Sequence, residues 1–161
     1  MLTETNIQIL LAHHPVGEPT KKDFHIESTP IPTEAAEQVL IRTIYLSLDP
    51  YMRGRMRAGP SYATALQVGD VITGEVVGEV VSSKSTDFSA GDIVNANIGW
   101  QAYGVADSNV VRRVDPTLAP ISTSLGILGM PGCTAYCGLL KVGSKVGSTR
   151  RTTFESATCR S

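Results

Sequence analysis

Short apolar runs separated by turn residues dominate the chain up to residue 114. Val and Ile, which favour strands, are frequent in the runs, while Gly, Pro, Asp and Ser cluster between them. The runs cover residues 7–12, 39–48, 71–82, 93–100 and 109–114. This pattern predicts a mainly β domain, with Trp100-Gln-Ala-Tyr103 on a further strand.

Two glycines, Gly74 and Gly78, interrupt the Val-rich run at 71–82. In closed or strongly coiled sheets, such glycines mark bulges, corners or places where another backbone approaches closely. Together with the short strands they predict a small β-barrel. Trp100 and Tyr103 then either pack in its core or edge, or lie over its mouth.

The spacing of apolar residues changes from alternating to helical between residues 123 and 140. A serine or threonine at 122–124 can cap a helix, and Pro131-Gly132 interrupts the helical pattern. We expect two short helices or one kinked helix in this region.

Length and charge exclude several functional classes. The 161 residues suit one domain with a substantial core, and a net charge of −1 does not favour general binding to nucleic acid or anionic membranes. The first residues lack the basic start of a signal peptide, and no apolar window has the length of a membrane span. We therefore expect a cytoplasmic protein that binds neither nucleic acid nor membrane.

Cysteines and histidines give no indication of a disulfide framework or a metal site. The cysteines are Cys133, Cys137 and Cys159, and the histidines are His13, His14 and His25. Three is an odd number of cysteines, and none of these residues stands at a recognisable zinc spacing. We expect a reducing compartment, no metal, and Cys133 as a packed small residue rather than a nucleophile.

The most informative stretch follows the second apolar run. It reads Leu46-Ser-Leu-Asp-Pro-Tyr-Met-Arg-Gly-Arg-Met56. Proline fixes φ and removes a backbone donor, so Asp49-Pro50 is expected to end the strand. Tyr51 therefore lies at a strand end, where binding groups concentrate.

Three arginines alternate in and after this stretch, at Arg53, Arg55 and Arg57. If the segment is extended, alternate residues share one face. The arginines then form either a cationic stripe suited to a phosphate or a solvated edge.

The stretch at 46–56 resembles a signature of the leukotriene B4 12-hydroxydehydrogenase, prostaglandin reductase and curcumin reductase branch of the medium-chain dehydrogenase/reductase superfamily. Two later stretches resemble the same branch in the same order, Pro60-Ser-Tyr62 and Leu128-Gly-Met-Pro-Gly-Cys-Thr-Ala-Tyr-Cys-Gly-Leu-Leu140. The resemblance runs from about Ile7 to Gly143. It implies a zinc-independent protein whose GroES-like, partly open β-barrel carries short helices.

The resemblance also implies a reaction. In that branch, NADPH reduces the carbon–carbon double bond of an α,β-unsaturated carbonyl compound of the alkenal/one, prostaglandin or curcumin type. Hydride addition at the β carbon generates an enolate, whose oxygen needs a preorganised donor. Tyr62 is the implied catalytic residue that binds the substrate carbonyl, and Tyr51 is implied to lie near the nicotinamide. The alternatives are a surface tyrosine at 62 and a packing residue at 51.

The segment 128–140 is implied to lie beside the nicotinamide as well. Met130, Gly132 and Thr134 are the implied cofactor contacts. Glycines at 126, 129 and 132 leave room for another group to approach the backbone closely. The alternative is packing of this segment against the barrel.

The end of the chain departs from the family. Eight of the residues at 144–161 are Ser or Thr and four are Lys or Arg, without strand or helical periodicity. No Gly-x-Gly-x-x-Gly follows a predicted strand, so a Rossmann cofactor domain is expected to be lacking. We expect a catalytic domain at 1–121, a helical connector at 122–143 and an atypical, disordered tail at 144–161, as in a truncated, frameshifted or alternatively spliced product.

Three functional hypotheses follow. The first is the N-terminal part of an NADPH-dependent enone reductase, inactive alone because binding of the cofactor spans two domains. The second is a non-enzymatic interaction module, which self-associates through the apolar docking face that the barrel exposes. The third is a truncated gene product without function.

Overall fold

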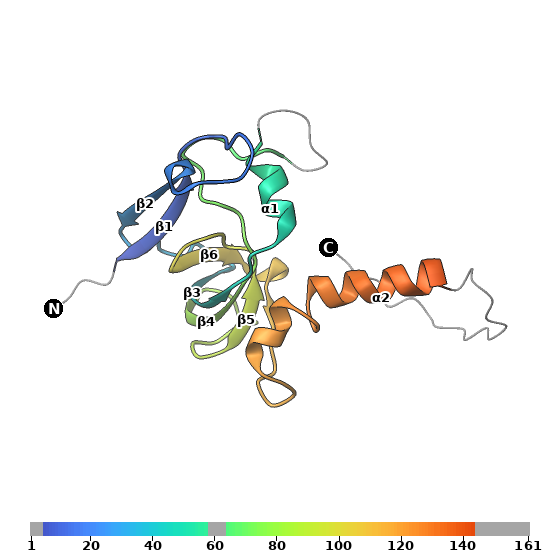
Figure 1. The fold of residues 1–161 in the computed structure, drawn as a ribbon. Helices are drawn as coiled ribbons and strands as arrows, with labels where there is room; N and C mark the ends of the chain where they lie inside the picture. Colours follow the sequence, from blue (N-terminus) through green and yellow to red (C-terminus); the bar gives the residue numbers. More distant parts are fainter. Residues whose placement is uncertain (1–4, 58–63, 144–161) are drawn as a thin grey trace.

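The computed structural model describes residues 5–57 and 64–143, which form two antiparallel sheets and several helices (Figure 1). The smaller sheet pairs β1 (Asn6–Leu11) with β2 (Phe24–Thr29). The larger sheet has the order β6 (Tyr103–Asp107), β3 (Gln38–Leu46), β4 (Val76–Ser83), β5 (Ile93–Ala96) and β7 (Arg112–Arg113). The helices are η1 (Lys21–Asp23), α1 (Pro50–Arg55), η2 (Ser108–Val110), η3 (Ile121–Leu125) and α2 (Met130–Gly143).

Backbone contacts join the two sheets without closing them into one ladder. Isolated bridges pair Gln8 with Gln101 and Leu10 with Val71. The amide of Ala102 also donates to the carbonyl of Ile7 at 2.9 Å. The predicted mainly β, partly open barrel with short helices is therefore confirmed.

Two groups of buried side chains form the core. The first lies within the larger sheet and contains Val39, Ile41, Val76, Val80, Val94, Ala96, Ile98 and Val111. The second lies between the smaller sheet and α1 and contains Leu11, Met52, Met56, Leu66 and Ile72. Each fully buried side chain of this size contributes about 1.5–3 kcal/mol relative to an exposed one. The second group therefore fixes α1 against the barrel.

Gly78 confirms the expected close approach of a second backbone. It pairs with Thr43, and the register between β3 and β4 shifts beside this pair. A Cβ atom on Gly78 would lie 2.5 Å from the carbonyl oxygen of Arg42. At Gly74 the approaching group is a side chain, because a Cβ there would lie 2.8 Å from the ring of Trp100.

Several predicted strands are shorter than their apolar runs. The run at 71–82 is a strand only from Val76, the run at 93–100 ends as a strand at Ala96, and the run at 109–114 supplies only β7. The predicted further strand begins at Tyr103, whereas Trp100 precedes it in a bend. Trp100 instead stacks on Phe24, with ring centroids 5.9 Å apart, which supports the packing interpretation of this residue.

The C-terminal described segment consists of two helices, η3 and α2, but the expected break at Pro131-Gly132 is wrong, because both residues lie in the first turn of α2. η3 packs against β4 and β5, whereas α2 has its contacts chiefly with η3. In Figure 1, α2 extends away from the barrel. Among the residues that the structure describes, no helix is long and apolar enough to span a bilayer.

Candidate functional site

The segment after β3 is the helix α1, so the extended conformation considered for the arginines at 53–57 is wrong. Pro50 occupies the first turn of α1, a position that suits proline because its fixed φ is already helical and its missing N–H has no partner there in any helix. Pro50 thus begins a helix, whereas β3 has already ended at Leu46. Tyr51 follows it and packs, half-buried, against the second core group.

Burial raises the pKa of the Tyr51 phenol above its ordinary value. The carboxylates of Asp49 and Glu75 act in the same direction, while a hydrogen bond with Thr73 and the charge of Arg55 oppose it. The phenol therefore remains protonated at neutral pH and can donate one hydrogen bond. Its ring presents an apolar face beside that donor.

A polar chain of contacts holds α1 beside the barrel near Tyr51. Arg55 donates from Nε to the carbonyl of Thr64 at 3.1 Å and from Nη1 to the Thr73 hydroxyl at 3.3 Å. The Thr73 hydroxyl donates in turn to Oδ1 of Asn97 at 3.4 Å. Arg55, Thr73 and Asn97 line a hollow of about 340 Å³. Arg55 thus positions the hydroxyl that interacts with Tyr51.

Arg53 serves a different contact, which fits neither expected alternative for the arginines, a cationic stripe or a solvated edge. Its Nη2 donates to the carbonyls of Pro15 at 3.0 Å and Gly17 at 2.6 Å, and its Nε donates to Gly17 at 3.2 Å. Residues two positions apart on a helix do not share a face. Arg53 and Arg55 therefore hold two separate parts of the chain, and neither lies on an extended solvated edge.

The three residues implied as cofactor contacts lie together on the first turns of α2. Met130 is 44% exposed, Thr134 is exposed and Gly132 is half-buried. A Cβ atom on Gly132 would lie 1.8 Å from the carbonyl oxygen of Ile127. The expected close approach at this glycine therefore comes from the chain's own backbone. Its role toward a cofactor stays a prediction.

At Gly129 the close approach also comes from the chain's own backbone, whereas no atom approaches Gly126 closely. A Cβ on Gly129 would lie 2.0 Å from the carbonyl oxygen of Ser124, whereas a Cβ on Gly126 would meet Thr123 only at an ordinary 3.8 Å. The three glycines thus do not share one steric cause.

Tyr62 lies outside the described residues, as do the rest of its motif and the predicted tail at 144–161. The relation between Tyr51 and Tyr62 therefore stays a prediction. Sequence reasoning missed Thr73 and Glu75, which influence Tyr51 from a stretch interpreted as plain strand. A polar residue at each of these positions within an apolar run was the available signal.

Titratable side chains do not assemble into a metal centre in the described part of the chain. No group of three or more His, Cys, Asp or Glu residues there is arranged to hold an ion. What the arrangement offers is a protonated phenol at one end of α1 and a partly exposed apolar turn at the start of α2. Such groups suit a flat, partly apolar ligand that carries a hydrogen-bond acceptor.

Comparison with known proteins identifies the family. Residues 7–114 match the N-terminal domain of oxidoreductase. NADPH-dependent curcumin reductase of Escherichia coli (strain K12) is 43% identical over 147 residues, which cover 91% of this chain and 43% of that protein. Prostaglandin reductase 1 of Rattus norvegicus is 40% identical over 143 residues, which cover 86% of this chain and 41% of that protein.

A solved structure shows the same relationship. The crystal structure of CurA in complex with NADPH from Vibrio vulnificus matches with a TM-score of 0.80 and 42% identity, over 86% of this chain and 41% of that chain. The chain thus spans less than half the length of the relatives that it matches. It belongs to the medium-chain dehydrogenase/reductase superfamily, in the branch of the curcumin and prostaglandin reductases.

Proposed function

We propose that this chain supplies one wall of the active site of an NADPH-dependent reductase acting on the carbon–carbon double bond of α,β-unsaturated carbonyl compounds. The observation that carries the proposal is the half-buried, protonated Tyr51 within the stretch at 46–56. The similarity to NADPH-dependent curcumin reductase and to prostaglandin reductase 1 supports it.

The residues present fit the nicotinamide end of NADPH better than its phosphates. Met130 and Thr134 offer an exposed thioether and hydroxyl on adjacent turns, which suit a flat ring with a carboxamide. Arg53 and Arg55, by contrast, are engaged with carbonyl and hydroxyl oxygens of the chain itself. We therefore propose that a part of the relatives without counterpart in these 161 residues holds the phosphates.

When bound, NADPH supplies a hydride for the carbon β to the substrate carbonyl. In the proposed mechanism, the Tyr62 phenol donates a hydrogen bond to the carbonyl oxygen, which becomes an enolate oxygen as the reaction proceeds. A donor preorganised toward such an oxygen contributes about 3–4 kcal/mol. Tyr51 closes the apolar side of the site, and Arg55 positions Thr73 against the Tyr51 phenol.

The chain alone is expected to turn over little or no substrate, because one wall of a cleft does not hold a dinucleotide tightly. The test is the loss of NADPH absorbance when the purified chain is mixed with NADPH and an enone. No loss above the protein-free rate is expected. Turnover at the rate of a full-length relative would show that the 161 residues form a complete site.

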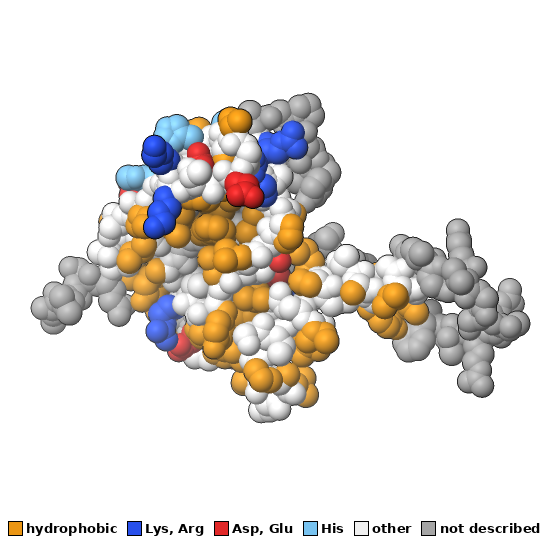
Figure 2. Space-filling view, in the orientation of Figure 1, with side chains coloured by type: hydrophobic (Ala, Val, Ile, Leu, Met, Phe, Trp, Pro, Cys, Tyr) orange, Lys and Arg blue, Asp and Glu red, His pale blue; other side chains and the backbone are white. Residues whose placement is uncertain are grey.

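A second candidate function rests on the uncovered face of α2. Its exposed apolar residues are Met130 at 44%, Tyr136 at 54%, Leu139 at 72% and Leu140 at 51%. Figure 2 shows apolar side chains on the extension of the molecule that α2 forms in Figure 1. Exposed apolar patches commonly mark interfaces, so the chain is proposed to self-associate here.

Light scattering after size-exclusion chromatography tests this second function. Leu139→Glu with Leu140→Lys should convert associated chains to monomers. Val16→Glu is the matched control, because Val16 is 99% exposed and lies far from α2 in the sequence. A monomeric parent chain at high concentration would exclude self-association and leave the reductase proposal intact.

A further inference from the structure

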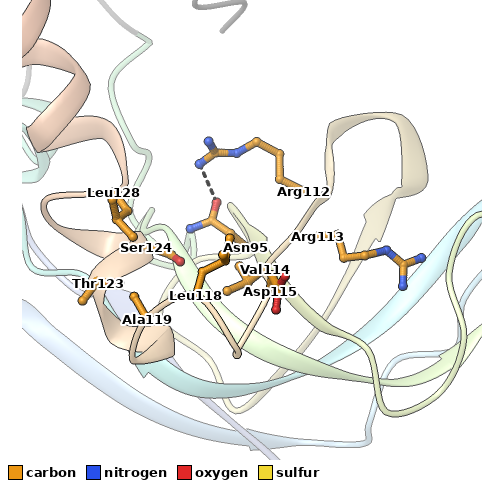
Figure 3. Close-up of a pocket in the computed structure, with 10 residues that line it drawn as sticks. All are labelled: Asn95, Arg112, Arg113, Val114, Asp115, Leu118, Ala119, Thr123, Ser124 and Leu128. Atoms are coloured by element: carbon orange, nitrogen blue, oxygen red, sulfur yellow. Dashed lines mark hydrogen bonds between the residues drawn. The ribbon is translucent and has the colours of Figure 1, made fainter.

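A second hollow lies between β5, β7 and the segment that contains η3 (Figure 3). Its volume is about 190 Å³. Asn95, Arg112 and Ser124 contribute polar groups to it, while Val114, Leu118 and Leu128 contribute apolar walls. Of the implied reductase residues that the structure describes, Tyr51, Met130, Gly132 and Thr134, none lines it.

Asn95 is the polar group that distinguishes this hollow. The residue is only 3% exposed, and its Oδ1 accepts a hydrogen bond from Nη2 of Arg112 at 2.9 Å. Its Nδ2 is shielded from water and finds no hydrogen-bond partner in the part of the chain that the structure describes. In Figure 3 this nitrogen lies on the side of the Ser124 hydroxyl. A buried donor thus stands in the wall of a hollow without an acceptor.

The orientation of the amide is fixed by its neighbour. Arginine has only donors, so Arg112 must face the oxygen of Asn95 rather than its nitrogen. Arg112 is held in turn by Glu75, with Nη2 3.0 Å from Oε1. If the Asn95 side-chain amide were rotated by 180°, its NH₂ group would face the guanidinium of Arg112, and two donors would oppose each other without an acceptor. The unpaired Nδ2 is therefore built into the fold.

Such donors are rare, because burial without a partner removes the hydrogen bonds to water and returns none. A ligand acceptor would repay this loss. The short helix η3 carries Ser124 and precedes Leu128, which is 61% exposed at the hollow. Because Nδ2 is shielded, an acceptor that reaches it has to displace part of its surroundings.

The charges around the hollow favour a neutral ligand. Arg112 is paired with Glu75, and Arg113 lies 2.6 Å from Asp92. Hydrogen bonds from the hydroxyl and amide of Thr117 lower the pKa of Asp115, so this lining carboxyl stays negative. An anion would meet two paired cations and a free negative charge. An uncharged acceptor meets no such penalty.

Size and lining limit the ligand further. An apolar cavity of about 150 Å³ holds benzene, so this hollow accommodates a single ring with one small substituent. We propose that it binds a small, neutral, ring-sized carbonyl compound, whose oxygen accepts a hydrogen bond from Asn95 Nδ2. This site is separate from the proposed reductase chemistry and does not depend on it.

Cyclohexanone is a suitable probe, because it carries a carbonyl and has no carbon–carbon double bond to reduce. Titration of the ¹⁵N-labelled chain should give saturable shifts in the side-chain amide signal of Asn95 and the backbone amides of Ser124 and Leu128. Cyclohexane should bind at least about fivefold more weakly, as expected for one lost hydrogen bond.

Three variants complete the test. Asn95→Leu removes the donor and should weaken cyclohexanone binding by about fivefold to tenfold. Ala119→Phe fills the hollow, keeps Asn95 and should abolish the shifts. Asn109→Leu, at an exposed asparagine that does not line the hollow, should bind like the parent chain.

The proposal is overturned if the parent chain shows no saturable shifts at these signals, including the case in which a trapped water already satisfies Asn95. It is also overturned if a folded Asn95→Leu chain binds cyclohexanone as tightly as the parent. A folded Ala119→Phe chain that keeps binding would likewise exclude this hollow as the site.

Discussion

The carbonyl oxygen of Arg42 lies 2.5 Å from the position that a Cβ atom would take on Gly78. This contact joins β3 to β4 where their register shifts, so β3 approaches β4 there more closely than any side chain allows. α1, which carries Tyr51, follows β3 after a short connection, so this contact also helps to position Tyr51.

Gly78→Ala should therefore destabilise the chain, because a strand backbone cannot move aside as a flexible side chain can. Overpacking of this kind costs about 1–3 kcal/mol. Denaturant unfolding followed by circular dichroism measures the change. Gly54→Ala is the matched control, because a Cβ there meets nothing within 4 Å. It lies within α1 and should leave stability unchanged or raise it by about 0.5–1 kcal/mol. Equal stabilities of the two variants would contradict this account of Gly78.

Arg53→Met should loosen residues 14–17 from α1. The substitution keeps the apolar stem and removes the donors to the carbonyls of Pro15 and Gly17. Hydrogen bonds from a charged donor contribute about 1.5–3 kcal/mol, so unfolding should become easier by about that amount. Hydrogen exchange should also accelerate at 14–17. The exposed Arg57→Met should show neither effect, and similar exchange in both variants would refute the anchoring role.

The phenol of Tyr51 should make stability depend on alkaline pH. Its pKa is raised in the folded state, so the folded chain keeps the proton that the unfolded chain begins to lose near pH 10. The contribution is fully present below pH 10, and it is lost as the pH rises through the folded-state pKa. Unfolding free energies measured across this range should fall less steeply for Tyr51→Phe than for the parent. Identical slopes would show that the environment of Tyr51 does not favour the neutral phenol.

The stacked pair of Phe24 and Trp100 offers an optical readout of the smaller sheet. Trp100 is the single tryptophan of the chain, so its fluorescence reports this contact alone. Phe24→Leu should shift the emission to longer wavelength and lower stability by about 0.5–1.5 kcal/mol beyond the loss of buried area. An unchanged emission spectrum in a folded variant would mean that the rings do not stack in solution.

The larger sheet could be predicted because β3, β4 and β5 lie within apolar runs rich in Val and Ile, which supply most of the first core group. β2 could not, since four of its six side chains are exposed and its apolar pattern is weak. α1 was missed for another reason, because Pro50 was interpreted as the end of a strand, whereas it begins the helix. For β2 and α1, the local pattern of apolar residues therefore did not indicate the structure that contacts with the rest of the chain stabilise.

The candidate site divides in the same way. Local sequence indicated helical structure after residue 122, whereas the place of Tyr51 within α1 and the start of α2 at Met130 could not be predicted from it. The roles of Arg53 and Thr73 depend on loops that reach α1 from distant parts of the chain. The spacing of residues within one segment does not indicate such contacts. The alternating arginines therefore suggested a cationic stripe, which the helix does not form.

The most direct test of the proposed function is a chimera in which residues 7–143 replace the matching stretch of Escherichia coli curcumin reductase. The account predicts NADPH-dependent reduction of curcumin by this chimera. Tyr62→Phe in the chimera should lower kcat by about 10²-fold or more, as for loss of an oxyanion donor, while the Kd for NADPH stays the same. A folded chimera that binds NADPH but reduces no curcumin, or that is unaffected by Tyr62→Phe, would contradict the account.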